Sequence, residues 1–129
     1  MKKMRTTQRK GDIAVTKAIS TFTSLGCDVS LPITESAPYD IVVDYKNTLY
    51  RVQVKYSSSN EIDLRNIHSN SKGYVVKKTN KNTYDWLYVL YKSEQEYLVP
   101  ECLHDRRSIT FFDDRYNLEK TLLSLISTK

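Results

Sequence analysis

Two runs of strand-forming residues joined by a short polar turn constrain the fold of this chain more than any other feature of its sequence. Residues 39–45 and 49–56 are rich in Val, Ile, Leu and Tyr, and the polar residues 46–48 separate them. Branched and aromatic side chains favour β-strands, and two such runs separated by a few polar residues favour a hairpin. Residues 41–43 are apolar without interruption, so we expect the first strand to be covered on both faces.

Three polar residues of this hairpin form a candidate metal and catalytic site. Asp40 opens the first run, and Gln53 and Lys55 lie near the end of the second. Residues two apart along a strand project from one face, so Gln53 and Lys55 point the same way, and the hairpin can bring Asp40 beside them. The Asp40 carboxylate, the Gln53 amide and the backbone carbonyl of Val54 offer oxygen ligands that Mg²⁺ accepts. Lys55 would then orient a water or stabilise negative charge, which suits hydrolysis of a phosphodiester bond.

The same three residues also have a structural interpretation. Asp40 can cap a strand, and Gln53 and Lys55 can form the solvated face of an amphipathic strand. The choice between the two interpretations depends on the elements around them.

Size and composition favour a single domain over residues 1–129. Of the 129 residues 40% are hydrophobic, and ten Tyr, three Phe and one Trp are spread along the chain, which excludes compositional disorder. No apolar run approaches the roughly 20 residues that span a bilayer, and no apolar signal core follows the N-terminus. We therefore expect an intracellular protein without membrane contact. Cys27 and Cys102 lack the spacing of a zinc site, and we expect them to be reduced.

The charge of the chain suits a polyanionic partner such as DNA or RNA. The net charge is +5 and the pI is about 9.1. Basic residues cluster within residues 1–10, which we expect to form a flexible arm, and again within residues 72–81. Many soluble proteins are equally basic, so charge alone does not establish nucleic-acid binding.

Periodicity predicts a helix, several strands and a second helix. Apolar residues recur at helical spacing over 11–25, and Gly26 follows as a C-cap. Asn117 or Asp114 is expected to cap a C-terminal helix that includes Leu118 and Leu122. The remaining predicted strands cover 27–33, 62–64, 74–76, 85–91, 96–99 and 109–112, with loops at 34–38 and 66–73. This order favours an α/β or α+β domain with a central mixed sheet flanked by an N-terminal and a C-terminal helix.

The arrangement of these elements resembles the PD-(D/E)XK nuclease superfamily, which has the restriction-endonuclease-like fold. The residues that carry the resemblance are 11–14 on the first helix, 38–40 before the first hairpin strand, and 52–55 in the second. Residues 84–89 and 97–100 look like the later hairpin of one branch. That branch comprises group I intron homing endonucleases, in which glutamine replaces the usual acidic residue of the third motif.

The resemblance implies a four- or five-stranded mixed core sheet with flanking helices and divalent-metal-dependent cleavage of double-stranded DNA. By matching position, Asp40 is the motif aspartate, Gln53 replaces the acidic residue, and Lys55 is the motif lysine. Mg²⁺ is the expected ion, with Mn²⁺ as a substitute. One domain carries one active site, so a double-strand cut predicts a homodimer or homotetramer and a palindromic target.

The sequence departs from the superfamily pattern at two positions. Many members place a metal-binding glutamate on the first helix, where this chain has Val15, which cannot be a ligand. Asp12 lies three residues earlier on nearly the same helix face and can substitute, or it can simply be an acidic residue favourably placed in the first turn. Glu35 is a weaker substitute. The neutral Gln53 lowers the negative charge of the site, so an inactive nuclease remains an alternative.

Several basic and polar residues are candidates for DNA contacts, each with a structural alternative. The basic side chains of the first helix can bind phosphates or solvate the helix, those of 77–81 can bind the DNA backbone, and Arg65 and His68 can reach base edges. Ser57 can touch phosphate or end its strand. The DNA-binding candidates are Arg9, Lys10, Lys17, Ser57, Arg65, Lys77, Lys78 and Lys81.

Three functional hypotheses follow. The first is a site-specific, Mg²⁺-dependent DNA endonuclease with Asp40, Gln53, Lys55 and Asp12 as its catalytic residues. The second is a nuclease of the same fold that resolves Holliday junctions or repairs DNA. The third is a DNA-binding module that has lost catalysis.

Overall fold

The structure, a computed structural model, describes residues 6–59, 61–63, 66–70, 73–77, 83–102, 108–110, 117–118 and 120–122. Its main sheet has the strand order β1-β2-β3-β7-β8, and two further pairs, β4–β9 and β5–β6, form separate ribbons. The elements in chain order are α1 (Thr6–Ser24), β1 (Asp28–Ser30), β2 (Ile41–Tyr45), β3 (Thr48–Ser57), β4 (Glu61–Asp63), β5 (Asn66–Asn70), β6 (Gly73–Lys77), β7 (Trp86–Tyr91), β8 (Glu96–Val99) and β9 (Ser108–Thr110).

The main sheet is mixed, as the sequence predicts. β3 and β7 are parallel, with Val52 opposite Trp86, while the other neighbouring pairs are antiparallel. A parallel pair needs a crossover connection, and here the chain between β3 and β7 includes β4, β5 and β6. The predicted α/β class with a central mixed sheet is therefore confirmed.

The helix α1 ends as predicted but begins earlier. Gly26 has a φ of 90°, and the amides of Gly26 and Cys27 donate to the carbonyls of Thr23 and Phe22 at 3.0 Å, which closes the helix in a Schellman motif. The prediction of a flexible arm over residues 1–10 is wrong for residues 6–10, which are helical. Polar residues carry no apolar period, but they form a helix readily when one side of it stays in water.

The hairpin of β2 and β3 follows the prediction with a tighter turn. Tyr45 pairs with Thr48, so only Lys46 and Asn47 connect the strands. Their φ angles are 53° and 65°. Left-handed conformations at both positions are typical of the type I′ turn, whose twist matches that of the strands it joins.

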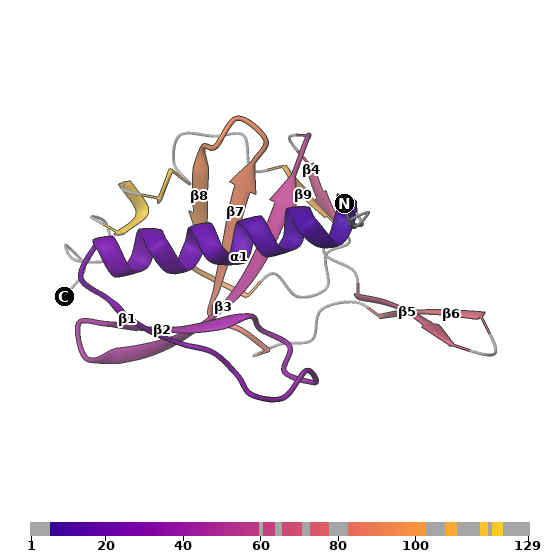
Figure 1. Ribbon diagram of the computed structural model, residues 1–129, viewed down its shortest axis with the longest axis horizontal. Helices are drawn as coiled ribbons and strands as arrows, with labels where there is room; N and C mark the ends of the chain where they lie inside the picture. Colours follow the sequence, from indigo (N-terminus) through magenta and orange to yellow (C-terminus); the bar gives the residue numbers. More distant parts are fainter. Residues whose placement is uncertain are drawn as a thin grey trace, which may run out of the picture.

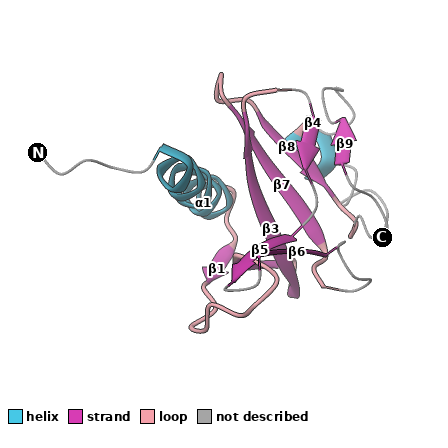
Figure 2. Cartoon of the chain, turned by 90° about the vertical axis from the view of Figure 1, so that its right-hand side faces the viewer, coloured by secondary structure: helices cyan, strands magenta, loops and turns pink. Residues whose placement is uncertain are grey.

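Two apolar clusters lie on opposite faces of the sheet. The helix α1 crosses one face (Figures 1 and 2), where its buried Ala14, Ala18 and Phe22 pack against residues such as Val52 and Val54 of β3. Phe22 contacts the rings of Trp86 and Tyr88. The second cluster, on the other face, comprises Tyr84, Leu87, Val89, Tyr97 and Val99. Because strand side chains alternate, β7 and β8 contribute to both clusters, whereas β2 and β3 contribute only to the one beneath α1.

Two other predicted segments need correction. The strand predicted over 27–33 covers only Asp28–Ser30, and Leu31 and Ile33 beyond it are exposed. Residues 66–73, predicted as a loop, include the strand β5. Four of the five residues of β5 are polar, so its sequence carries no apolar alternation that would predict the strand.

The C-terminal helix is confirmed as far as it is described. Residues 118 and 120–122 are helical, and the Lys120 amide donates to Asn117 Oδ1 at 3.3 Å, so Asn117 is the predicted cap. Leu118 and Leu122 join the cluster beneath α1. Thr121 donates to the Leu98 carbonyl at 3.2 Å, which fixes this turn to β8. Residues 123–129 and Asp114 lie outside the described residues.

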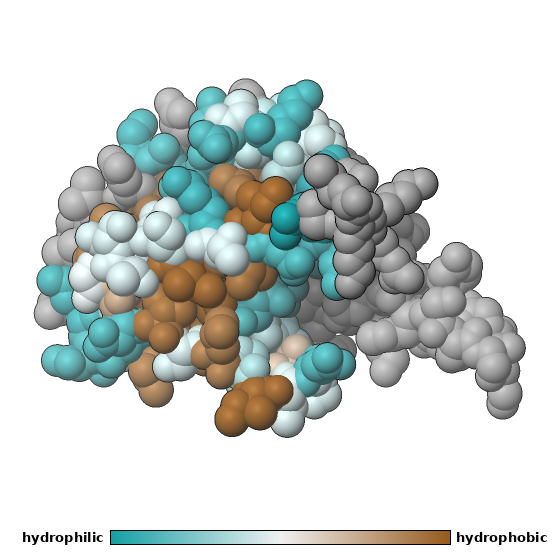
Figure 3. Space-filling view, in the orientation of Figure 1, coloured by the Kyte–Doolittle hydropathy of each residue, from teal (hydrophilic) through white to brown (hydrophobic). Residues whose placement is uncertain are grey.

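Figure 3 shows apolar side chains gathered between α1 and β1 on the face that carries the helix. Leu31 and Ile33, after the edge strand β1, are 60% and 100% exposed. Such a surface commonly marks a contact with another molecule. Among the described residues, no helix has both the length and the apolar character needed to cross a membrane.

A buried polar contact ties α1 to the sheet. Thr21 and Tyr88 both donate their hydroxyl groups to Glu96 Oε2, each at 2.6 Å. Tyr88 is fully buried, and burial together with this acceptor raises the pKa of its phenol above the ordinary value. Glu96 therefore provides the hydrogen-bond acceptor that the buried Tyr88 hydroxyl requires.

Replacing Glu96 with alanine should lower the free energy of unfolding by about 2 kcal/mol, because the buried Tyr88 hydroxyl loses its acceptor. Urea denaturation measures this change. Glu101→Ala removes an exposed carboxylate and serves as the control, with an expected change within about 0.5 kcal/mol. Equal midpoints for the two variants would contradict the assigned role of Glu96.

Candidate active site

Asp40 is held against β3 by two hydrogen bonds. Its amide donates to the Val52 carbonyl at 2.9 Å, and the Val54 amide donates to Asp40 Oδ2 at 2.8 Å. The side chain thus takes the place that a backbone carbonyl of β2 would occupy if the strand began earlier. Aspartate is short enough to do this from the position just before the strand.

The Val54 carbonyl faces the same side as the Asp40 carboxylate. In an extended strand the N–H and C=O of one residue point to the same neighbour. Because the Val54 amide points at Asp40, its carbonyl does so as well. β2 begins at Ile41 whereas β3 continues to Ser57 beside β7, so this carbonyl lies where the sheet opens.

Gln53 and Lys55 lie on the face of β3 opposite α1. They are half-buried and alternate with Val52 and Val54, which point into the cluster under the helix. Ile41 pairs with Val52, so Gln53 lies beside Asp40 at the end of the pairing. Among the described residues, the side chains of Gln53 and Lys55 make no hydrogen bond or ion pair.

The surroundings of Asp40 act on its carboxyl group in opposite directions. Partial burial raises the pKa of Asp40 above its usual value, and this is the largest effect. The Val54 amide and the positive charge of Lys55 lower it. Lys55 is therefore near enough to act electrostatically on Asp40 without an ion pair. Ionising the partly buried carboxyl group of Asp40 costs free energy, and the nearby cation of Lys55 reduces that cost.

The oxygen donors at this position fit a hard divalent cation. Asp40 contributes a carboxylate and Val54 a carbonyl on the same side, and Gln53 contributes an amide oxygen beside them. Mg²⁺ binds such oxygens and usually keeps several waters. Within the described ranges, no three His, Cys, Asp or Glu side chains cluster around a common point. The described side chains therefore do not surround Asp40 with further acidic, His or Cys ligands in a group of three.

The proposed substitutes for the missing glutamate lie apart from Asp40. Asp12 is exposed on α1, on the opposite face of the sheet, and is not among the charges that shift the Asp40 pKa. Val15, at the glutamate position, packs against the apolar cluster. Glu35 is exposed in the loop between β1 and β2. The structure therefore brings together Asp40, Gln53, Val54 and Lys55 but not Asp12.

The DNA-binding candidates on α1 divide by exposure. Arg9 and Lys17 are exposed, whereas the Lys10 ammonium lies 5.5 Å from the centre of the Tyr56 ring, near the end of β3. Contact with the ring fixes this cation at the end of the sheet where Asp40 lies.

Of the other DNA-binding candidates, the structure describes Ser57 and the backbone of Lys77. Ser57 is buried, and its hydroxyl donates to the Ser59 carbonyl at 2.6 Å, which favours its alternative role as a strand terminator. Lys77 closes β6. Arg65, Lys78 and Lys81 lie outside the described residues.

A second aspartate, which the sequence analysis missed, mirrors Asp40 on the other side of β3. The Arg51 amide donates to Asp85 Oδ2 at 2.8 Å, and the Asp85 amide donates to the Arg51 carbonyl at 2.8 Å. The repeated Tyr-Asp dipeptide, before β2 and again before β7, is the signal that predicts it. Unlike Asp40, Asp85 pairs with a guanidinium, since Arg51 Nε lies 3.1 Å from Oδ2.

This ion pair gives Asp85 a structural role, and it makes the stability of the fold depend on pH. Arg51 holds the pKa of Asp85 below its usual 3.8. Replacing Asp85 with asparagine should lower the free energy of unfolding by about 1 kcal/mol, and Tm by about 4 °C, because both groups are more than a third exposed to solvent. A depressed pKa adds stability above the unfolded value, and this stability is lost as the pH falls through the folded value.

The difference in the free energy of unfolding between wild type and Asp85→Asn should therefore be largest at neutral pH. It should disappear as the pH falls below about 3.8. Thermal unfolding across this range measures it. Asp28→Asn, on the exposed edge strand, is the matched control. A difference that persists in acid would contradict the role of the ion pair.

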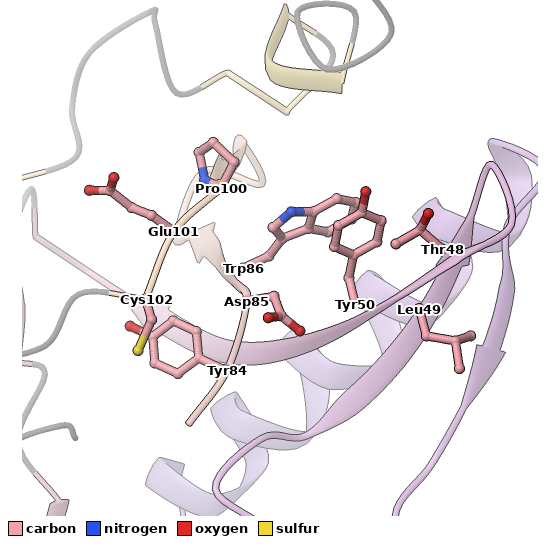
Figure 4. A pocket seen from close by; sticks show the side chains of 9 residues that line it. All are labelled: Thr48, Leu49, Tyr50, Tyr84, Asp85, Trp86, Pro100, Glu101 and Cys102. Atoms are coloured by element: carbon pink, nitrogen blue, oxygen red, sulfur yellow. The ribbon is translucent and has the colours of Figure 1, made fainter. Parts of the chain in front are cut away.

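A hollow lies at the opposite end of β3. A cavity of about 420 Å³ is bordered by Tyr50, Trp86 and Asp85 and by residues 100–102 (Figure 4). The rings of Tyr50 and Trp86 stack there with centroids 4.1 Å apart. None of Asp40, Gln53 and Lys55 borders it, so this cavity is distinct from the candidate active site.

Comparison with known proteins agrees with this geometry. Residues 5–112 match the family described as PD-(D/E)XK endonuclease. The chain belongs to this family and is a nuclease, of a class that generally uses divalent metal ions. The resemblance stated from the sequence is therefore confirmed.

A solved structure has the same fold. It is that of a bacterial homing endonuclease, I-Ssp6803I, with a TM-score of 0.75. The similarity covers 97% of this chain and 100% of that chain at 22% sequence identity, a level at which the likeness establishes a shared fold. No curated protein sequence matches the chain.

Proposed function

We propose that this protein is a Mg²⁺-dependent endonuclease that cuts double-stranded DNA at a specific sequence, with its active site at Asp40. The observation that carries the proposal is the Asp40 carboxylate, which the Val54 amide holds just before β2 begins and which the charge of Lys55 influences. Membership of the PD-(D/E)XK family and the fold shared with a homing endonuclease support it.

The residues at this site have distinct roles in the proposal. Asp40, Gln53 and the Val54 carbonyl hold the metal ion, which supplies Lewis-acid stabilisation of the phosphate and a more acidic water. Lys55 orients the attacking water and stabilises negative charge as it develops. Arg9, Lys10 and Lys17 contact DNA phosphates along α1. We do not assign Asp12 to the metal, because it lies on the other face of the sheet.

The proposal includes an assembly of two or four copies, since each chain contributes one active site to a double-strand cut. The exposed Leu31 and Ile33 beside the edge strand β1 offer an apolar surface for such a contact. Sedimentation of the purified protein tests it, and a monomer that only nicks DNA would contradict it.

A catalytically inactive DNA-binding module is the second candidate function. Two features favour it: among the described residues no three acidic, His or Cys side chains gather at the site, and the pKa of Asp40 is raised. Both features weaken metal binding, which requires an ionised ligand.

Incubation with a pool of plasmid and genomic DNA in Mg²⁺, Mn²⁺ or EDTA separates the two candidates. We expect discrete cuts in Mg²⁺ or Mn²⁺ and intact DNA in EDTA. Intact DNA under all conditions, with retained binding in a gel shift, would replace the endonuclease with the inactive module. Preferred cutting of four-way junctions over linear duplex would instead indicate a junction-resolving enzyme.

A further inference from the structure

Lys10 continues the row of α1 residues that faces the sheet. Ala14 and Ala18, one turn and two turns further along the helix, are fully buried in the cluster beneath it. Residues four apart share a helix face, so Lys10 points toward the sheet as well. It is half-buried, whereas Arg9 and Lys17 are exposed. Lys10 therefore lies against the protein rather than in open solvent.

The side chain that Lys10 contacts is Tyr56, near the end of β3. Val52, Val54 and Tyr56 alternate toward α1, and the Tyr56 ring packs against the cluster beneath the helix. The Lys10 ammonium lies 5.5 Å from the centre of this ring, within the range of a cation–π contact. The contact restricts a long, flexible side chain before any partner binds, so less conformational freedom is lost on binding.

This contact leaves the Lys10 ammonium able to bind an anion. An aromatic ring attracts a cation without neutralising its charge. Within the described part of the chain, no carboxylate forms an ion pair with Lys10. The first turn of α1 contains no acidic residue that would offset the positive end of the helix dipole. Both features favour an anionic partner beside the start of α1.

The Lys10–Tyr56 pair lies close to the candidate active site along β3. Val54, whose amide holds Asp40, is two residues before Tyr56, a separation of about 7 Å in a strand. α1 begins beside this end of β3 (Figure 1). Lys10 is not among the charges that shift the pKa of Asp40, whereas Lys55 is. Lys10 thus suits a phosphate that flanks the one at Asp40, because phosphates of one strand follow each other at about 3.4 Å of rise.

We propose that Tyr56 is a positioning residue for DNA binding, whose ring holds the Lys10 ammonium where it contacts a phosphate beside the site at Asp40. The inference rests on the proposed function, because it assigns a residue to the DNA-binding surface next to that site. It distinguishes Lys10 from the exposed Arg9 and Lys17, whose phosphate contacts do not depend on Tyr56.

A double-mutant cycle in binding tests the pair in the full chain. The probe is a duplex selected by wild type from the DNA pool, by cutting or else by binding, and gel shifts in EDTA at several salt concentrations measure its affinity. Lys10→Met, which keeps a long side chain, should lower the salt dependence of affinity by about one unit. Tyr56→Leu should weaken binding by about two- to fivefold, the strength of an exposed cation–π contact. It should have no further effect in the Lys10→Met protein.

Two controls separate positioning from packing. Tyr56→Phe keeps the ring and should restore the affinity that Tyr56→Leu loses. Tyr56→Leu should weaken binding equally in wild type and in Lys17→Met, because Lys17 is an exposed cation elsewhere on α1. Thermal unfolding checks that each variant is folded. Tyr56→Met, with its adaptable side chain, replaces Tyr56→Leu if leucine unfolds the protein.

The outcomes separate this inference from the proposed function. If the cycle shows coupling but no DNA is cut in Mg²⁺ or Mn²⁺, the endonuclease is wrong and the role of Tyr56 stands. If wild type cuts DNA and Tyr56→Leu weakens binding equally with and without Lys10, or not at all, the role of Tyr56 is wrong and the endonuclease stands. An unchanged salt dependence in Lys10→Met also overturns the role of Tyr56, since Lys10 then contacts no phosphate. A wild type that binds no DNA overturns both.

Discussion

Replacing Asp40 with asparagine is expected to reduce DNA cleavage by about a thousandfold while leaving the fold intact. A metal ion contributes several kcal/mol to stabilisation of the transition state, and each 1.36 kcal/mol corresponds to about tenfold in rate. The side-chain oxygen of asparagine can still accept the Val54 amide, so the local hydrogen bond survives. Cleavage of the selected site in Mg²⁺ by equal amounts of the two proteins measures the loss.

The same variant has a stability signature that distinguishes catalytic loss from misfolding. The pKa of Asp40 is raised in the folded state, so its contribution to stability is greatest below the unfolded pKa and is lost as the pH rises through the folded pKa. At neutral pH Asp40→Asn should therefore be at least as resistant to urea as wild type, and this advantage should disappear in acid. A lower midpoint at neutral pH would contradict this account of the buried charge.

Asp44→Asn is the matched control for Asp40→Asn. Asp44 lies on β2 opposite Leu49, toward the other end of the hairpin, and is half-buried like Asp40. Its cleavage rate should match that of wild type. If Asp40→Asn and Asp44→Asn lose activity equally, the loss results from removing a negative charge near β2 and not from a specific role of Asp40.

Lys55→Ala is expected to reduce the cleavage rate by about a hundredfold or more, the effect of removing one preorganised group that stabilises developing charge. Binding should weaken by no more than one phosphate contact, which lowers the salt dependence of affinity by about one unit. Single-turnover cleavage and gel shifts at several salt concentrations measure the two effects. Loss of binding and cleavage in the same proportion would assign Lys55 to DNA binding and not to the reaction.

Lys46→Asn is the control for the loss of a positive charge. Lys46 is exposed in the turn between β2 and β3, and asparagine tolerates its left-handed conformation. Its cleavage rate should equal that of wild type. A hundredfold loss in this variant would show that net charge, rather than the position of Lys55, governs the rate.

Elements governed by local rules follow directly from the sequence. The hairpin of β2 and β3, the parallel-paired β7, the Gly26 cap and the Asn117 cap are all predicted, because apolar alternation and capping residues act over a few positions. The motif of Asp40, Gln53 and Lys55 is also local, since its residues lie within one hairpin. Segments without an apolar pattern, such as residues 6–10 and β5, are not predicted correctly.

The sequence therefore specifies which residue types are available for the candidate site. The tertiary structure specifies which side chains lie next to each of them and whether a neighbouring charge neutralises it. Asp40 and Asp85 have the same Tyr-Asp setting and the same hydrogen bond to β3, yet Arg51 neutralises only Asp85. Asp12 has the right chemistry for a metal ligand, but the helix that carries it covers the opposite face of the sheet. These differences depend on which strands lie side by side and which face α1 covers, and packing between residues distant in sequence decides both.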